Sequence, residues 1–259
     1  MSEAFRTRGT LEGLESTLLW DFGCQGVWQD GEDLVAYFEK RLDLPLEGTW
    51  ETTDDQQFIK QYYETLQPIY LEKLVVAPTH TEVTLKAPQR VIWLDPGMAF
   101  GTGHHETTHM ALSALERLEL TNKTVLDVGS GSGILTIAAS FLSANSHGID
   151  IDAATILVAK ENARLNGSRA TFAEGTLENV PDDSADIIVG NLFAELHVIL
   201  AFHYARVLRS NGELIVTGIL SEKSEKVKEA VEYFFEITTE QTMNEWTLLR
   251  GKRKEERGK

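Results

Sequence analysis

Several features are missing from this chain of 259 residues. Its single cysteine, Cys24, cannot form a disulfide within the chain, so we expect a reducing compartment. No run of about 18 apolar residues occurs, which argues against a membrane-spanning helix. The first nine residues, MSEAFRTRG, hold no apolar stretch of the export-signal type, and we therefore expect a cytoplasmic protein.

Two phosphate-binding patterns are also missing, although residues 129–133 form a glycine-rich segment, GSGSG. The dinucleotide pattern G-x-G-x-x-G would need a third glycine where Ile134 or Thr136 stands, and no Gly-Lys-Ser or Gly-Lys-Thr of a Walker loop follows. Asp127 precedes the segment on a strand-like run, TVLDV. A carboxylate there opposes a pyrophosphate, but it can accept hydrogen bonds from the α-amino group of a methionine moiety.

The glycine-rich segment and a second acidic residue together predict a nucleoside site. A strand that turns sharply into a helix leaves backbone N–H groups facing a ligand, and Gly129 and Gly131 let that ligand approach closely. The next strand ends at Asp150, 21 positions after Gly129, where a carboxylate can accept hydrogen bonds from both ribose hydroxyls. The alternative is a glycine-rich turn that binds no ligand.

Acidic side chains outnumber basic ones. The formal net charge is −16, and residues 1–55 hold 4 basic and 13 acidic side chains, a net charge of −9. A field of this sign repels a bare phosphate backbone and attracts a cationic partner. We therefore interpret the amino-terminal part as a docking surface for a basic protein, without direct binding of nucleic acid. The alternative is that these side chains only keep the protein in solution.

The apolar pattern predicts two domains. Residues 1–53 are expected to form a small α/β domain of about four strands, and residues 54–70 a linker helix that Asp54 and Asp55 cap. Residues 71–252 alternate strands with helices, which is typical of a mainly parallel sheet with ligands at the carboxyl ends of its strands. Residues 253–259 are expected to form a flexible tail. One helix, at 193–208, is predicted to bury Phe193, Leu196, Leu200, Tyr204 and Leu208.

Three motifs resemble those of a known enzyme class. They are VLDVGSGSG at 125–133, GIDID at 148–152 and GNLFAEL at 190–196, and they resemble class I S-adenosylmethionine-dependent methyltransferases. The segment DPGMAFGTGHHETT at 95–108 resembles one branch, the PrmA family, which methylates amino groups of large-subunit ribosomal protein eleven. The resemblance spans essentially the whole chain. It implies an α/β fold with a Rossmann-like, mainly parallel seven-stranded sheet, a small ferredoxin-like amino-terminal domain, and a monomeric enzyme.

The resemblance also implies roles for individual residues. Asn191 is implied as the catalytic residue, close to the methyl group that is transferred. Phe100 is implied to shield the sulfonium, Thr108 to contact the methionine portion, and Asp150 to bind the ribose. The amino-terminal domain is implied to bind the ribosomal protein. The implied cofactor-binding residues are Phe100, Thr108, Asp127, Gly129, Gly131, Asp150 and Asn191.

Residues 105–109, HETTH, stand in a segment where many family members read THPTT, and they match the H-E-x-x-H pattern of zinc proteases. A metzincin would need a third ligand ten residues after His105, where Leu115 stands. Gly101 and Gly103 also place His105 at the start of a helix instead of its middle. We therefore expect no metal site.

Three functions remain open at this stage. The first is methylation of lysine side-chain and N-terminal amines of a large-subunit ribosomal protein, in which the Asn191 carbonyl orients the amine. His104, Glu195 and His197 could accept a proton there, and each also fits a structural role. The second is methylation of RNA or a small molecule, which the charge of −9 opposes for RNA. The third is a module that binds S-adenosylmethionine without catalysis, and the intact Asn191 loop favours catalysis over it.

Overall fold

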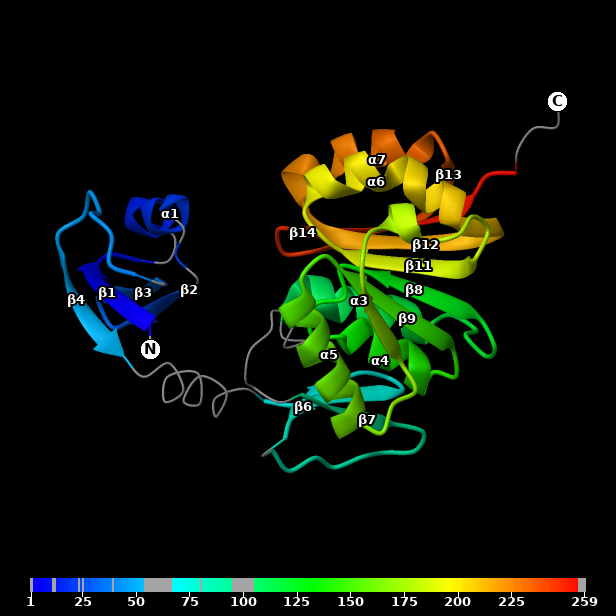
Figure 1. Ribbon diagram of the computed structural model, residues 1–259, viewed down its shortest axis with the longest axis horizontal. Coiled ribbons are helices and arrows are strands. Elements are labelled where there is room, and N and C mark those ends of the chain that lie inside the picture. Colours follow the sequence, from blue (N-terminus) through cyan, green and yellow to red (C-terminus); the bar gives the residue numbers. More distant parts are fainter. Residues whose placement is uncertain are drawn as a thin grey trace. The chain divides into compact units, whose positions relative to one another are not determined.

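The computed structural model describes residues 2–10, 13–22, 24, 26–38, 40–53, 67–79, 81–94 and 105–255. The chain divides into two compact units, Met1–Glu64 and Thr65–Lys259 (Figure 1). The predicted linker helix, residues 54–70, lies outside the described residues as far as residue 66, and Ile69–Tyr70 at its end form the strand β5. None of the helices in the described part of the chain is long and apolar enough to cross a membrane.

The small unit is an antiparallel sheet with the ferredoxin-like strand order β2-β3-β1-β4. Its core contains Phe5, Leu19 and Phe38, and the ring centroid of Trp50 lies 5.0 Å from that of Phe5. Three leucines of the segment between β3 and β4 pack against this core in the place where a second helix usually lies. The elements are β1 (Ser2–Arg8), α1 (Leu14–Asp21), β2 (Gly26–Asp30), β3 (Asp33–Phe38) and β4 (Gly48–Thr53).

The large unit contains a seven-stranded sheet with the order β10-β9-β8-β11-β12-β14-β13. The strands β10, β9, β8, β11 and β12 run parallel to one another, and β14 is antiparallel to both of its neighbours, β12 and β13. The prediction of a mainly parallel sheet is therefore confirmed. Strand order reverses beside β8, which has β9 on one side and β11 on the other. The strands are β8 (Thr124–Val128), β9 (Asn145–Asp150), β10 (Thr171–Glu174), β11 (Ala185–Asn191), β12 (Leu208–Leu220), β13 (Phe235–Met243) and β14 (Trp246–Arg253).

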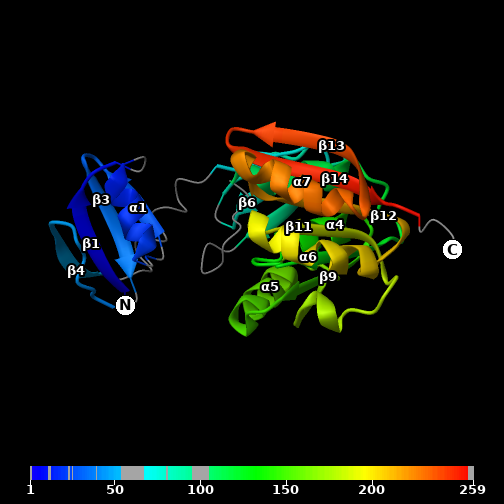
Figure 2. The same cartoon turned by 90° about the horizontal axis from the view of Figure 1, so that it is seen from above.

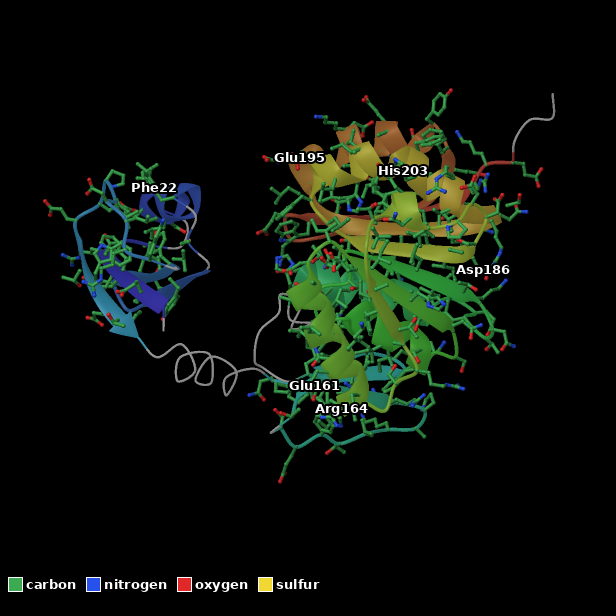
Figure 3. All side chains as sticks on the ribbon, in the orientation of Figure 1. Phe22, Glu161, Arg164, Asp186, Glu195 and His203 are labelled. Atoms are coloured by element: carbon green, nitrogen blue, oxygen red, sulfur yellow. The ribbon has the colours of Figure 1, made fainter. Side chains whose placement is uncertain are left out.

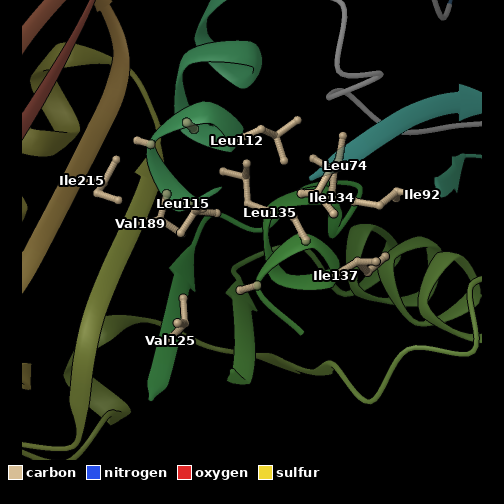
Figure 4. Packing of buried hydrophobic residues seen from close by; sticks show 14 of the residues in the cluster. Leu74, Ile92, Leu112, Leu115, Val125, Ile134, Leu135, Ile137, Val189 and Ile215 are labelled. Carbon is tan, nitrogen blue, oxygen red and sulfur yellow. The ribbon is translucent and has the colours of Figure 1, made fainter. Parts of the chain in front are cut away.

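Helices cover both faces of this sheet because its strands are apolar on both sides. Alternate residues of one strand face opposite ways. Val125 packs in the cluster with α3 and α4 (Figure 4), whereas Leu126 packs in the cluster with α6 and α7. Figures 1 and 2 show α6 and α7 side by side on the second face. The helices are α3 (Glu106–Glu116), α4 (Ile134–Phe141), α5 (Ala153–Leu165), α6 (Ala194–Val207) and α7 (Ser224–Glu232), with short 3-10 helices at Leu177–Asn179 and Ser221–Lys223.

A second, three-stranded sheet precedes the large one: β5 (Ile69–Tyr70), β6 (Leu74–Pro78) and β7 (Arg90–Leu94), in that order. It is fixed at two points. The buried carboxylate of Glu116, at the end of α3, accepts the backbone N–H groups of Glu72 (3.1 Å) and Lys73 (2.8 Å). At the free edge of β7, the side-chain amide of Asn166 accepts the N–H of Trp93 (2.7 Å) and donates to its carbonyl (2.6 Å).

The prediction for the buried face of α6 is wrong at its first turn. Phe193 is 73% exposed and Leu196 is 40% exposed, although Tyr204 and Leu208 are fully buried. Small residues and His197 make the buried side instead, because the helix lies close to the sheet there. Glu195 in the first turn and His203 near the end mark the two ends of α6 in Figure 3.

Candidate active site

The glycine-rich turn joins β8 to α4, and its glycines are required by the backbone. Gly129, Gly131 and Gly133 have φ angles of 71°, 51° and 81°, which residues with a Cβ rarely adopt. A Cβ on Gly129 would lie 2.4 Å from Cδ2 of Leu192, in the loop after β11. Because Gly129 has no side chain, the loops at the ends of β8 and β11 can lie in close contact.

The backbone N–H groups of this turn are not free, in contrast to the sequence-based expectation. The N–H groups of Gly129 (2.9 Å) and Ser130 (3.0 Å) donate to the carbonyl of Ile149, and that of Gly131 donates to Asp150 (3.1 Å). The turn folds onto β9 and satisfies its own donors. This arrangement suits a ligand without a phosphate, because a phosphate would need those donors.

Asp127 lies under the turn and is 1% exposed. Its Oδ2 accepts two hydrogen bonds from Thr136, from the backbone N–H (3.1 Å) and from the hydroxyl (2.6 Å). Its Oδ1 is buried and has no hydrogen-bond partner among the described residues. Burial raises the pKa of the Asp127 carboxyl to about 7, although the bonds from Thr136 act in the opposite direction. A buried oxygen without a donor is a site for a ligand that brings one.

Asp150 ends β9 and is held from both sides. Its Oδ2 accepts the N–H of Gly131 and its Oδ1 accepts the N–H of Asp152 (3.1 Å). Each oxygen keeps a lone pair for another donor, such as a ribose hydroxyl. The next residue, Ile151, is 77% exposed, although it is apolar. An exposed apolar side chain beside a ribose-binding carboxylate offers a surface for a base.

Asn191 ends β11, and its side-chain amide is oriented by α3. Its Nδ2 donates to the hydroxyl oxygen of Thr108 (3.3 Å), which leaves the amide oxygen, Oδ1, available to accept. Thr108 is 1% exposed. Gly218 follows Thr217, the register partner of Asn191, on β12 and has a φ angle of 84°. A Cβ on Gly218 would lie 2.9 Å from Oδ1 of Asn191. Glycine at position 218 therefore keeps space around the amide oxygen.

The first two residues of the H-E-x-x-H pattern, His105 and Glu106, have other partners. His105 is the N-cap of α3, its Nδ1 lies 2.8 Å from the hydroxyl of Thr107, and its ring stacks edge-on against Trp246. The carboxylate of Glu106 accepts a hydrogen bond from Asn244 (2.8 Å). Among residues that the structure describes, no three or more His, Cys, Asp or Glu side chains form a group that could hold a metal ion.

The structure brings six of the seven predicted site residues to one edge of the sheet. The turn at Gly129 and Gly131 adjoins Asp150 directly, and Asn191 contacts Thr108, while Asp127 lies below the turn. Phe100 and His104 lie outside the described residues. Sequence reasoning missed Ile151 and Gly218. The only signals were an apolar residue directly after the acidic strand end, and a glycine within a strand-like run.

A model of the family described as ribosomal protein L11 methyltransferase (PrmA) matches residues 17–254. Two similar proteins carry the name ribosomal protein L11 methyltransferase. That of Thermus thermophilus is 41% identical over 250 residues, which are 95% of this chain and 97% of the relative. That of Deinococcus radiodurans is 41% identical over 256 residues, 92% of this chain and 93% of the relative.

A solved structure is similar as well. The crystal structure of ribosomal protein L11 methylase from Lactobacillus delbrueckii subsp. bulgaricus matches with a TM-score of 0.68 and 34% sequence identity. The match covers 73% of this chain and 100% of that one. It agrees with the mainly parallel seven-stranded sheet of the large unit.

Proposed function

The chain belongs to the PrmA family, the ribosomal protein L11 methyltransferases, and we propose that it methylates lysine side-chain and N-terminal amines of ribosomal protein L11 with Asn191 as the orienting residue. The methyl donor is S-adenosylmethionine. Of the three functions that the sequence left open, family membership selects the first. The observation that carries the role of Asn191 is the orientation of its amide. The Thr108 hydroxyl accepts a hydrogen bond from Nδ2, which leaves Oδ1 to accept one from the substrate amine.

The residues of the site fit S-adenosylmethionine. The unpartnered Oδ1 of Asp127 suits the α-ammonium group, Asp150 suits the ribose, and exposed Ile151 suits the adenine. Because Gly129 and Gly131 use their N–H groups internally, the turn has no need of a phosphate. When bound, this cofactor supplies an electrophilic methyl group on a sulfonium. We propose that Thr108 and Phe100 complete the site, on the side of the methionine portion.

Asn191 acts on the acceptor amine in this proposal. A lysine side chain has a pKa near 10.4, so a neutral amine at pH 7.4 costs about 4 kcal/mol in water. Desolvation beside a cation lowers that pKa and reduces this cost. The Oδ1 of Asn191 then accepts one N–H bond, so that the lone pair points along the line of transfer. No strong base is required for this step. His197 is excluded as a base for the acceptor because it is fully buried within the protein.

Substituting Asn191 with alanine tests the proposal. We expect turnover on L11 to fall at least about 100-fold, because orientation contributes mainly to the transfer step, while the cofactor Kd changes less than about threefold. Transfer of a radioactive methyl group to purified L11 measures the first, and calorimetric titration the second. Asn145→Ala, at the exposed start of β9, is the matched control and should leave both unchanged. Unchanged turnover in Asn191→Ala would remove Asn191 from the mechanism.

We propose that the protein is a cytoplasmic monomer and that its partner is a basic ribosomal protein. In this proposal the small unit binds that protein and makes no contact with nucleic acid. Support comes from the charge of residues 1–55, which hold 13 acidic and 4 basic side chains. Naked ribosomal RNA in the same assay should accept no methyl groups, and methylated RNA would favour the second of the three functions instead.

A further inference from the structure

Two polar side chains, His197 and Tyr204, lie on the buried side of α6, and both are fully buried. Nδ1 of His197 lies 3.0 Å from the Tyr204 hydroxyl, and Nε2 lies 2.8 Å from the backbone carbonyl oxygen of Thr217. Burying polar groups between a helix and a sheet costs free energy, and apolar side chains could fill the same space. Packing alone therefore does not explain the pair.

The carbonyl of Thr217 connects this pair to the active site. Thr217 on β12 is the register partner of Asn191 on β11. Its carbonyl oxygen accepts the N–H of Leu192 (3.0 Å) as well as Nε2 of His197. A Cβ on Gly190 would lie 3.5 Å from Cε1 of His197. The imidazole thus lies beside Gly190 and shares the Thr217 carbonyl with Leu192, the residues on either side of Asn191.

The partners of the ring determine its tautomer. A carbonyl oxygen can only accept, so Nε2 carries the proton that faces Thr217, and Nδ1 accepts from the Tyr204 hydroxyl. Burial lowers the pKa of His197 to about 4, so the ring is neutral at physiological pH. Without the hydroxyl of Tyr204, Nδ1 would be a buried acceptor without a donor. The other tautomer would then compete, and it would turn a lone pair toward the Thr217 carbonyl.

We propose that His197 and Tyr204 form a positioning pair that holds the Asn191–Leu192 backbone through the Thr217 carbonyl and so sets where Oδ1 of Asn191 meets the acceptor amine. This inference rests on the proposed role of Asn191. The pair acts on β11 and β12, whereas the proposed cofactor contacts of Asp127 and Asp150 come from β8 and β9. Loosening the pair should therefore change turnover and leave cofactor binding intact.

Tyr204→Phe in the full-length protein is the test, because it keeps the ring and removes only the hydroxyl. We expect kcat on L11 to fall about five- to tenfold, the effect of one misplaced hydrogen bond, with KM for L11 and the cofactor Kd within about twofold. In an Asn191→Ala background, Tyr204→Phe should cause no further loss. Tyr233→Phe, at a side chain that is 80% exposed, is the matched control and should keep full turnover.

The outcomes separate the two proposals. If Asn191→Ala lowers turnover but Tyr204→Phe does not, or if the two losses multiply in the double variant, the positioning pair is wrong and Asn191 keeps its role. If Asn191→Ala leaves turnover intact, both proposals fail. Nitrogen-15 spectra of the wild-type histidines give a second test that needs no variant to fold. A proton on Nε2 of His197 supports the pair, and a proton on Nδ1 overturns it.

Discussion

At the scale of single residues, the two carboxylate oxygens of Asp127 have different surroundings. Its Oδ2 is bound twice by Thr136, yet its Oδ1 is buried without a donor. Burial is the largest cause of the raised pKa, and the negative charge of Asp150 adds to it. Because the folded state holds the proton more tightly than the unfolded chain, stability falls as the pH rises from about 4 to about 7. A bound ammonium group would stabilise the ionised carboxylate and so reverse this loss of stability.

Cofactor affinity should therefore depend on pH through Asp127. Its pKa of about 7 means that the carboxyl is mostly protonated at pH 6, and only the ionised form pairs with an ammonium group. We expect the Kd for S-adenosylmethionine to be about sixfold lower at pH 7.5 than at pH 6, and to rise again above about pH 8, where the α-amino group of the cofactor loses its own proton. Calorimetric titration across this range measures it.

Asp127→Asn separates this effect from other titrating groups. The variant should bind more weakly at pH 7.5 and lose the change in Kd between pH 6 and pH 7.5, because its side chain presents no negative charge. Asp43→Asn, an exposed residue of the small unit, should behave as wild type. The same pH dependence in Asp127→Asn as in wild type would assign the titration to another group.

Strand ends were the part of the site that the sequence could predict. Asp127, Gly129 and Asp150 are close in the chain, and their spacing has a direct geometric meaning in a strand–turn–helix unit. The contact between Asn191 and Thr108 joins residues 83 positions apart, and no local pattern encodes it. The use of the turn's N–H groups could not be foreseen either, since it depends on how the turn folds onto β9.

At the scale of elements, α3 links the active site to the three-stranded sheet of β5, β6 and β7 in the large unit. Its first turns carry Thr108, which orients Asn191, and its last residue, Glu116, binds the turn between β5 and β6. The carboxylate of Glu116 is 3% exposed and accepts two N–H groups. The helix is therefore held at both ends by hydrogen bonds to other elements.

Glu116→Gln should destabilise the protein. One glutamine N–H group would face a backbone N–H and leave it without an acceptor, so the free energy of unfolding should fall by about 2 kcal/mol. Urea denaturation measures it. Glu229→Gln, on the exposed side of α7, should change it by less than about 0.5 kcal/mol. If both variants unfold at the same urea concentration, Glu116 does not fix the turn.

Most helices and strands of the seven-stranded sheet were predictable from the sequence. The separate sheet of β5, β6 and β7 was not predicted, because only tertiary pairing places these short apolar strands in a sheet of their own. In α6, close approach to the sheet favours Ala194 and Ala201 on the buried side, so Phe193 and Leu196 face outward despite their helical spacing. Residue size, and not hydrophobicity alone, decides the buried face.

At the scale of the whole molecule, the two compact units have separate cores, and the small unit carries the higher density of negative charge. In the small unit Arg6 pairs with Asp30 (2.8 Å) and Arg41 with Glu3 (2.7 Å), and Arg8 also has an acidic partner. These arginines are neutralised within the unit, whereas Asp43, Glu47 and Glu51 are exposed to solvent. Exposed ion pairs of this kind contribute little stability, and we propose that the net charge acts mainly by steering a basic partner.

A variant that begins at residue 67 tests the division of labour that we propose for the two units. It should bind S-adenosylmethionine with a Kd within about twofold of the full chain, because the site residues all lie in the large unit. Its kcat/KM on L11 should fall at least about 100-fold, since docking energy from the small unit is lost. In the full chain KM for L11 should rise with salt, as expected for electrostatic docking. A truncated enzyme with full activity on L11 would show that the small unit is dispensable.

The side chain of Asn166 has a consequence for colloidal behaviour. It makes hydrogen bonds with the backbone N–H and carbonyl of Trp93 on β7, the outer strand of the three-stranded sheet. These are the bonds that a neighbouring strand would make. Unpaired outer strands are templates onto which further chains polymerise. The amide thus blocks cross-β growth at this edge, and a shorter residue in its place would expose a nucleus for fibrils in concentrated solution.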